Sequence, residues 1–449
     1  MYSLKINLFT CILYSKGEIE LAKLQTEFHN FIQNLKALEL FIKVQDELMN
    51  INYRSRSLEN NEFTKAATEL ISDVVQLTND ISEGEYDIQI INKANEKFAD
   101  KGVNIFTKEV EYKDTPEVHF KISNSQMERE VGEVMKMADL VTRQQELLFR
   151  NSLTSLMIYF ENLISNIIKL RLSKFPNAFN PKEKTIKYKD LMDFESIDEA
   201  LDHLIENEVI DIMYGGFKSW VFYLNKAGVN TKKIDFFTEV INEAYSRRNL
   251  FVHNDGIINN VYLNKVSKEY SQDVAKGQRL SISEDYLIKA VNNVKIFGVI
   301  LLLEAWKVFD KNGHDDAYDY IMGKAFDSMK EHDWEFAKFI YEFLHAEADN
   351  HANKIITQMN IWLCEKELGN FKEIEESVKK CDVSGLQTHY ELAKLSLLEN
   401  SDKFFEILGH NPDSLDTEAL GEWPIFKYMR EDSRVNEYLQ DVESIGMIN

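Results

Sequence analysis

Cysteine, proline and glycine are scarce in this chain, which has 449 residues but only 3 cysteines, 5 prolines and 17 glycines. With a hydrophobic share of 44%, this composition excludes a disordered or collagen-like chain and favours a folded, mostly helical protein. Cys11, Cys364 and Cys381 are odd in number and form no CxxC pair, which argues against a disulfide framework and a structural zinc site. We therefore expect a protein of the reducing cytoplasm.

Long apolar runs are also missing. No uninterrupted run approaches the roughly 18 residues of a membrane-spanning helix. The apolar start, residues 6–14, is short and leads into Glu18 and Glu20, so a secretory signal is not expected. The sequence thus predicts no membrane partner.

Positive charge is in deficit, with 52 basic against 75 acidic residues and a net charge of −23. Such an excess argues against a protein that coats nucleic acid nonspecifically. The net charge is −8 over residues 1–140 and −15 over 311–449, whereas residues 141–310 hold 22 basic and 22 acidic side chains. A site for a polyanion would meet the least repulsion in this middle segment.

The spacing of apolar residues predicts a mainly α fold. Helical spacing covers four main stretches, residues 18–82, 127–174, 235–254 and 286–309. Alternating spacing predicts strands over 86–91 and 103–112, the second within a β-hairpin near 103–123.

The chain is too long for one core, so several domains are expected. The predicted domains are an N-terminal α+β region over 1–140, a helical bundle over 141–310 and a helical-repeat region over 311–449.

A weak repeat supports the last of these domains. A small turn followed by an aromatic helix start recurs three times, at residues 332–337, 369–374 and 400–405. This spacing resembles tetratricopeptide-type helical repeats. The resemblance implies a concave face for a protein or peptide partner, although a plain helical bundle without a binding role fits the same pattern.

Residues 247–256, RRNLFVHNDG, are the strongest candidate for chemistry. Arginine offers a planar cation that suits phosphate oxygens, and histidine transfers protons near neutral pH. Arg248 and His253 are five residues apart, about 140° around a helix, while Asn249 and His253 share one face. We expect Asn249 to orient the imidazole and Arg248 to reach the same cleft. Such a pair is the minimum equipment for cleaving RNA without a metal.

The end of the motif also has a structural reading. Gly256 suits the position after a helix, preceded by Asn254 and Asp255. Arginine and asparagine on a helix commonly form ion pairs or caps, and a histidine near a helix end commonly makes structural hydrogen bonds. About one Arg–His pair of this spacing is expected by chance in such a chain.

Three surrounding features make residues 143–310 resemble the HEPN domain family. They are Tyr159-Phe160-Glu161-Asn162 in the long helix, the Gly215-Gly216 break before Trp220, and the motif itself followed by Tyr262-Leu263. The resemblance implies an all-α bundle that dimerises through its motif helices. It also implies metal-independent endoribonuclease activity without a cofactor, as in many bacterial toxins and anti-phage systems.

By position, the resemblance implies Arg248 and His253 as the catalytic pair, with Asn249 between them. Arg247 is an alternative arginine, and Glu161 and Asn254 are possible supporting residues.

Two function classes follow from these observations. The first is an endoribonuclease whose RNA-cleaving site is completed in a homodimer, because each subunit supplies one histidine where an acid and a base are needed. The alternative is a non-catalytic scaffold that combines a HEPN-like dimerisation bundle with a helical-repeat partner platform.

Overall fold

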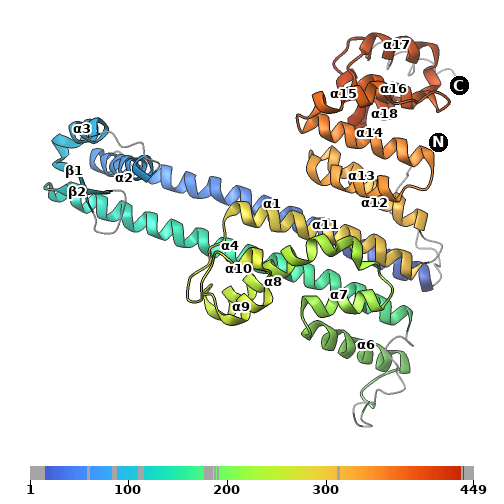
Figure 1. The fold of residues 1–449 in the computed structure, drawn as a ribbon, viewed down its shortest axis with the longest axis horizontal. Coiled ribbons are helices and arrows are strands. Elements are labelled where there is room, and N and C mark those ends of the chain that lie inside the picture. The colour runs from blue at the N-terminus through green and yellow to red at the C-terminus, as the bar shows by residue number, and fades with distance from the viewer. Residues whose placement is uncertain are drawn as a thin grey trace. The chain divides into compact units, whose positions relative to one another are not determined.

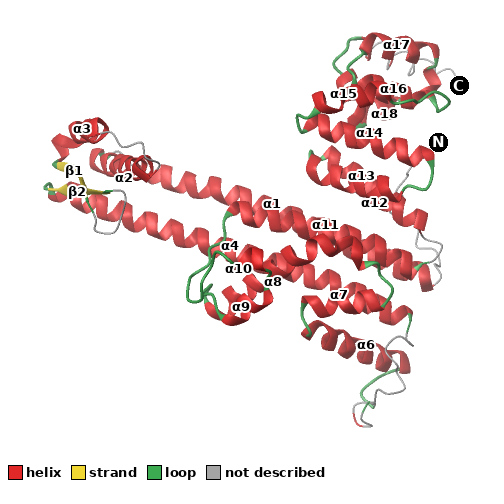
Figure 2. Cartoon of the chain, viewed as in Figure 1, coloured by secondary structure: helices red, strands yellow, loops and turns green. Residues whose placement is uncertain are grey.

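A computed structural model describes residues 16–57, 61–82, 88–109, 116–175, 186, 189, 192–310, 314–435 and 438. Helices make up most of these residues, and their strands form one antiparallel pair (Figures 1 and 2). The mainly α fold class is therefore confirmed.

The chain divides into two compact units, each assembled from separate stretches of sequence. The first unit comprises residues 1–30, 160–242 and 292–449, and the second comprises 31–159 and 243–291. Four helices contribute residues to both units: α1 (Lys16–Ser57), α4 (Ser125–Lys174), α8 (Asp235–Asn254) and α11 (Glu284–Phe309). The three contiguous domains predicted from the sequence remain a prediction.

A small α+β core lies in the second unit. It is built from α2 (Glu62–Ser82), α3 (Ile88–Phe98), the short 3₁₀ helix η1 (Ala99–Lys101), β1 (Val103–Lys108) and β2 (Glu117–Ile122). The strands pair in register from Val103 opposite Ile122 to Lys108 opposite Glu117. This register confirms the predicted β-hairpin.

The strand predicted over 86–91 is wrong for the described residues 88–91, which begin α3. Ile91, Ala94 and Phe98 are buried at helical spacing and pack into the same core as Leu70. Because these contacts recur every three to four residues, the packing favours a helix over the alternation that the short segment suggested.

The second unit also contains the end of α8 and the segment that follows it. This segment holds the short helices α9 (Asn260–Lys265) and α10 (Lys268–Ser271) before α11 begins. Leu250 on α8 packs with the buried side chains Ile258, Tyr262 and Val266. This cluster holds the loop against the last turn of the motif helix.

The bundle of the first unit is organised around aromatic side chains. It includes α6 (Ile197–Tyr214), α7 (Phe217–Lys226) and the 3₁₀ helix η4 (Thr231–Ile234), together with parts of α4 and α11. Phe160 and Phe297 lie with ring centroids 5.3 Å apart, and Phe217 packs against both. Trp220 donates a 2.9 Å bond from Nε1 to the carbonyl of Met213, which closes the turn between α6 and α7.

Helix α11 is the core helix of this bundle. By length and composition alone it is long and apolar enough to cross a membrane, although it is interrupted by charged residues. In the structure, 67% of its most apolar 18-residue window is buried within the protein.

The rest of the first unit is a series of short helical pairs, seen one after another in Figure 1. The pairs are α12 (His314–Lys330) with α13 (Trp334–Glu347), α14 (His351–Glu367) with α15 (Phe371–Lys380), and α16 (Thr388–Leu397) with α17 (Ser401–His410). They are followed by η5 (Pro412–Ser414), α18 (Thr417–Glu422) and η6 (Pro424–Met429).

Each pair is joined by a turn with one residue in the left-handed region. These residues are His332, Gly369 and Glu399, with φ of +63°, +88° and +55°. The three turns lie where the sequence repeat predicted them. The tetratricopeptide-type resemblance itself remains a prediction.

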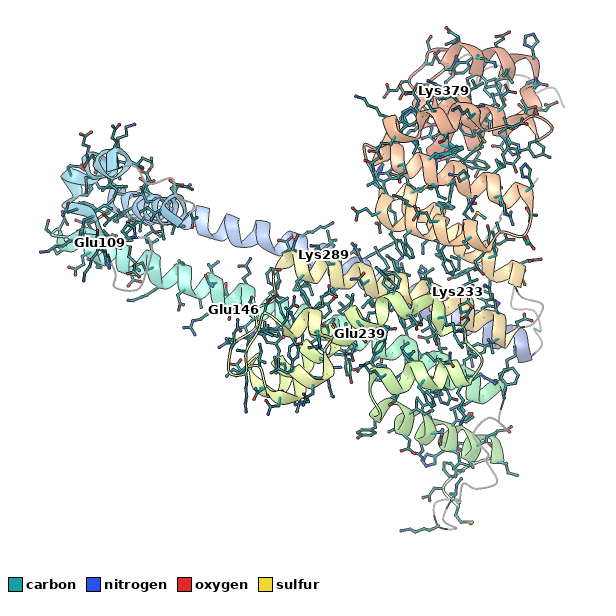
Figure 3. All side chains as sticks on the ribbon, viewed as in Figure 1. Glu109, Glu146, Lys233, Glu239, Lys289 and Lys379 are labelled. Atoms are coloured by element: carbon teal, nitrogen blue, oxygen red, sulfur yellow. The ribbon has the colours of Figure 1, made fainter. Side chains whose placement is uncertain are left out.

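An ion-pair network joins the bundle to the first helical pair. Lys233, labelled in Figure 3, lies 2.9 Å from Glu304 and 2.6 Å from Glu347. Lys307 on α11 also pairs with Glu347, at 2.6 Å. Several charges shared in this way hold α13 against α11 more firmly than an isolated surface pair would.

Candidate functional site

The three candidate catalytic residues all lie near the end of α8, which spans the predicted range 235–254. Arg248 and Asn249 are half-buried, and His253 is exposed. The guanidinium of Arg248 lies 4.8 Å from the ring centroid of Tyr245. Leu250, between them, is buried and anchors this turn of the helix.

His253 is not used as a structural hydrogen-bonding residue by the described part of the chain, in which no group hydrogen-bonds or ion-pairs with its imidazole. The hydrogen bond expected from Asn249 is therefore not formed. The imidazole instead faces solvent at the end of the helix. The exposed side chain is open to a ligand, as acid–base chemistry requires.

The helix is closed by two successive residues in the left-handed region. Asp255 and Gly256 have φ of +48° and +79°, and the Gly256 amide donates a 3.2 Å bond to the carbonyl of Leu250. A Cβ on Gly256 would lie 2.5 Å from the Phe251 ring, so glycine is required here by both backbone and space. Asp255 directly follows α8 as its C-cap and Gly256 takes the next position, C′, as the sequence predicts.

Asn254 has a structural part in this closure. Its side-chain amide donates to the carbonyl of Ile257, and its own carbonyl accepts a 2.8 Å bond from the Ile257 amide. These bonds satisfy groups left over at the helix end.

Arg247, the alternative arginine, is built into a buried network. Its Nε donates a 2.7 Å bond to Oε1 of Glu243, and its Nη1 donates a 3.0 Å bond to the carbonyl of Ser281. Its guanidinium also stacks over the Tyr286 ring, 4.1 Å from the centroid. Tyr262 and Tyr286 donate their hydroxyls to the same carboxylate, at 2.7 and 2.6 Å.

Burial sets the electrostatics of this network. Glu243 is 1% exposed and the Arg247 side chain 14%. Burial and the neighbouring Glu243 carboxylate raise the pKa of both Tyr262 and Tyr286 above the usual value. Burial lowers the pKa of Arg247, but the facing Tyr286 and Glu243 more than offset this effect and raise it. Tyr262 and Tyr286 are therefore neutral phenols at physiological pH, beside the Arg247 guanidinium.

A second charged cluster adjoins the end of α8 and was not identified from the sequence. Asp255 lies 2.8 Å from Arg150 of α4, and 3.4 Å from Arg279. Arg150 also stacks over Phe251, 4.9 Å from the ring centroid. Arg150 and Asp255 are 105 residues apart in the sequence, so no local pattern could have paired them.

Exposed apolar side chains flank His253. They are Val252 on the same helix and Ile257 and Val261 in the segment beyond it. All three belong to the second unit. Their exposure leaves apolar surface on the last turn of α8 and on the segment that follows it.

Glu161 belongs to the first unit, on the part of α4 that carries Phe160. Its proposed role in orienting an arginine therefore remains a prediction.

Within the described ranges, no three His, Cys, Asp or Glu side chains are grouped so that they could hold a metal ion.

Comparisons of the chain with protein-family models, curated proteins and solved structures found no match.

Proposed function

We propose that the protein is a metal-independent endoribonuclease with Arg248 and His253 as its catalytic pair. The observation that supports this proposal best is the different use of two consecutive arginines. Arg247 is bound into the core by Glu243, whereas Arg248 is half-buried on the same helix as the exposed His253. This difference supports Arg248, rather than Arg247, as the residue that binds phosphate.

The reaction needs one proton acceptor and one proton donor. A ribose 2′-hydroxyl attacks the adjacent phosphorus while one imidazole takes its proton. A second imidazole protonates the leaving 5′-oxygen, which yields a 2′,3′-cyclic phosphate and a 5′-hydroxyl end. The arginines stabilise the charge that develops on the phosphoryl oxygens.

A homodimer supplies the second histidine. Val252, Ile257 and Val261 support this part of the proposal, because apolar surface beside His253 suits contact with a second subunit. The symmetric pairing of two such surfaces would bring two Arg–His sets to one cleft. We place this enzyme in the cytoplasm and propose a toxin or anti-phage role, with the helical pairs of the first unit as the site of a protein or peptide partner.

The test is cleavage of a labelled RNA by the purified chain in the presence of EDTA. We expect cyclic-phosphate products from the wild type and their loss in both Arg248→Ala and His253→Ala. His410→Ala is a matched control, since His410 is also an exposed histidine in the last turn of a helix. Equal activity in the wild type and both motif variants would contradict the proposal.

A scaffold without catalysis is the second candidate, and the three helical pairs favour it because such pairs suit partner binding. Expression in a bacterial host separates the two functions. The nuclease predicts growth arrest that His253→Ala relieves. Normal growth with wild-type protein, under induction and phage challenge alike, would favour the scaffold.

A further inference from the structure

One carboxylate holds two arginines beside the motif. Arg150 lies close to Asp255, at 2.8 Å, and its side chain is 19% exposed. Arg279 lies farther away, with both terminal nitrogens 3.4 Å from the carboxylate, and its side chain is 52% exposed. The inner arginine is thus more closely bound than the outer one, whose side chain is more exposed.

The backbone fixes the outer arginine relative to the motif helix. Arg279 forms an isolated β-bridge with Ile257. On either side of Arg279, the amide of Leu280 donates a 2.9 Å bond to the carbonyl of Gly256, and Gln278 accepts a 2.8 Å bond from Ile258. Asp255 follows His253 by two residues, which places their Cα atoms within about 7.6 Å of each other. Arg279 is therefore held close to the candidate catalytic histidine.

The charge of this region differs from that of the chain as a whole. The stretch of the second unit that carries the motif, residues 243–291, contains seven lysines and arginines and six acidic residues, within a protein of net charge −23. Arg150 also has a second carboxylate partner, Glu146 at 3.8 Å, so it shares Asp255 with Arg279 only in part. This stretch therefore lacks the acidic excess of the chain as a whole, which lowers the repulsion that an anionic polymer would meet beside the general acid–base residue.

A purely stabilising role does not account for Arg279. A pair at 3.4 Å between half-exposed groups contributes little to folding, because solvent screens it. Arg150 already supplies Asp255 with a close partner. The second arginine is therefore in excess of what the helix end needs.

We propose that Arg279 binds a phosphate of the RNA strand next to the cleaved one, and that Asp255 positions it for this contact. The proposal rests on the proposed function, whose site it extends. Arg248 acts on the reacting phosphate, whereas Arg279 holds the strand through a neighbouring phosphate. Arg279 consequently contributes to binding and not to the chemical step.

The test measures binding separately from cleavage. The probe is a labelled single-stranded RNA with methylated 2′-hydroxyls, which removes the attacking group, bound to otherwise wild-type protein over a series of KCl concentrations. We expect Arg279→Gln to raise Kd about threefold to tenfold, as loss of one charge-assisted contact should. The slope of log K against log salt should fall by about 0.7, the value for one phosphate of a single strand.

Arg143→Gln is the matched control. Arg143 is an exposed arginine of the same unit that also pairs with one aspartate, Asp139, at 2.9 Å. Equal Kd and salt slope for Arg279→Gln, Arg143→Gln and wild type would overturn the inference. Failure of the wild type to bind the probe would overturn it as well.

A double-mutant cycle tests the positioning role of Asp255. Asp255→Asn keeps a residue that accepts the left-handed backbone but removes the charge that holds Arg279. In the Asp255→Asn protein, Arg279→Gln should leave Kd almost unchanged. An undiminished effect would contradict the positioning role.

Cleavage of the unmethylated RNA distinguishes the two proposals. In the cleavage assay, Arg279→Gln should raise KM and leave kcat unchanged, whereas His253→Ala abolishes kcat. RNA binding that depends on Arg279 without any cleavage would refute the nuclease and retain the phosphate contact. Cleavage that depends on His253 but not on Arg279, with unchanged binding, would refute the phosphate contact alone.

Discussion

Glu243 and Arg247 lie one turn apart on α8 and form a buried ion pair of 2.7 Å between Oε1 and Nε. The hydroxyls of Tyr262 and Tyr286 complete the coordination of the carboxylate. The pair fixes the rotation of α8 about its own axis, since Arg247 can face the core only while Arg248 points elsewhere. The buried arginine thereby determines where the neighbouring arginine is presented.

Substitution of each arginine should separate stability from activity. Arg247→Ala leaves the Glu243 carboxylate buried without its cation and should lower the free energy of unfolding by about 3 kcal/mol. Arg248→Ala should change it by less than about 1 kcal/mol while abolishing RNA cleavage. Urea unfolding and the EDTA cleavage assay measure the two effects. The roles would be reversed if Arg247→Ala were inactive but fully stable while Arg248→Ala kept its activity. Arg247 would then be the catalytic arginine.

The phenols of the same network predict a loss of stability in alkali. Burial and Glu243 raise the pKa of Tyr286 in the folded protein, whereas the pKa of a tyrosine in the unfolded chain is about 10. The contribution of Tyr286 to the free energy of unfolding is therefore complete below about pH 10. It decreases as the pH rises through the pKa that Tyr286 has in the folded protein. In Tyr286→Phe, unfolding free energies measured from neutral to alkaline pH should fall less steeply above about pH 10.

Tyr286→Phe should also lower stability at neutral pH by about 1–2 kcal/mol, because Glu243 loses a buried donor. Tyr214→Phe is the control, since Tyr214 is an exposed tyrosine. Identical pH profiles for Tyr286→Phe and the wild type would show that Tyr286 does not contribute to alkaline unfolding.

The spacing of apolar residues along the chain predicted the helices and strands of this fold, but not the contacts between them. The long apolar series of α4 and α8 gave correct helices because each buries one face over many turns. The strand predicted over 86–91 is wrong for residues 88–91 because so short a segment does not distinguish a helical period from a strand period.

The contacts around the site were beyond local spacing. Glu243 meets Tyr262 and Tyr286 from positions 19 and 43 residues away. The sequence therefore left Arg247 open as an alternative to Arg248, and the different surroundings of the two side chains are visible only in the tertiary packing. The Arg150–Asp255 pair was invisible for the same reason, because it joins α4 to the end of α8.

Gly256 should be required for the geometry of the motif. Gly256→Ala adds a Cβ at φ +79° and 2.5 Å from the Phe251 ring. We expect a loss of about 2 kcal/mol or more in unfolding free energy and reduced RNA cleavage, since the helix end beside His253 must shift. Gly277→Ala is the control for backbone strain alone, at φ +90° with open space around the Cβ. Equal destabilisation by the two substitutions would show that the contact with Phe251 has no effect.

The first helical pair should depend on a buried charge on α11. Lys295 is 0% exposed, lies 2.6 Å from Asp333 in the turn before α13, and its ammonium group is 4.5 Å from the Phe336 ring centroid. Asp333→Asn removes the countercharge and should lower the free energy of unfolding by about 3 kcal/mol, whereas Lys295→Met, which removes the charge itself, should cost less. Urea unfolding of both variants measures the difference. Glu422→Gln is the control: it removes one partner of the exposed 2.9 Å pair with Lys330 and should change the free energy of unfolding by less than about 1 kcal/mol. A larger loss of unfolding free energy in Lys295→Met than in Asp333→Asn would contradict this prediction. It would show that the ion pair with Asp333 is not what holds the turn to α11.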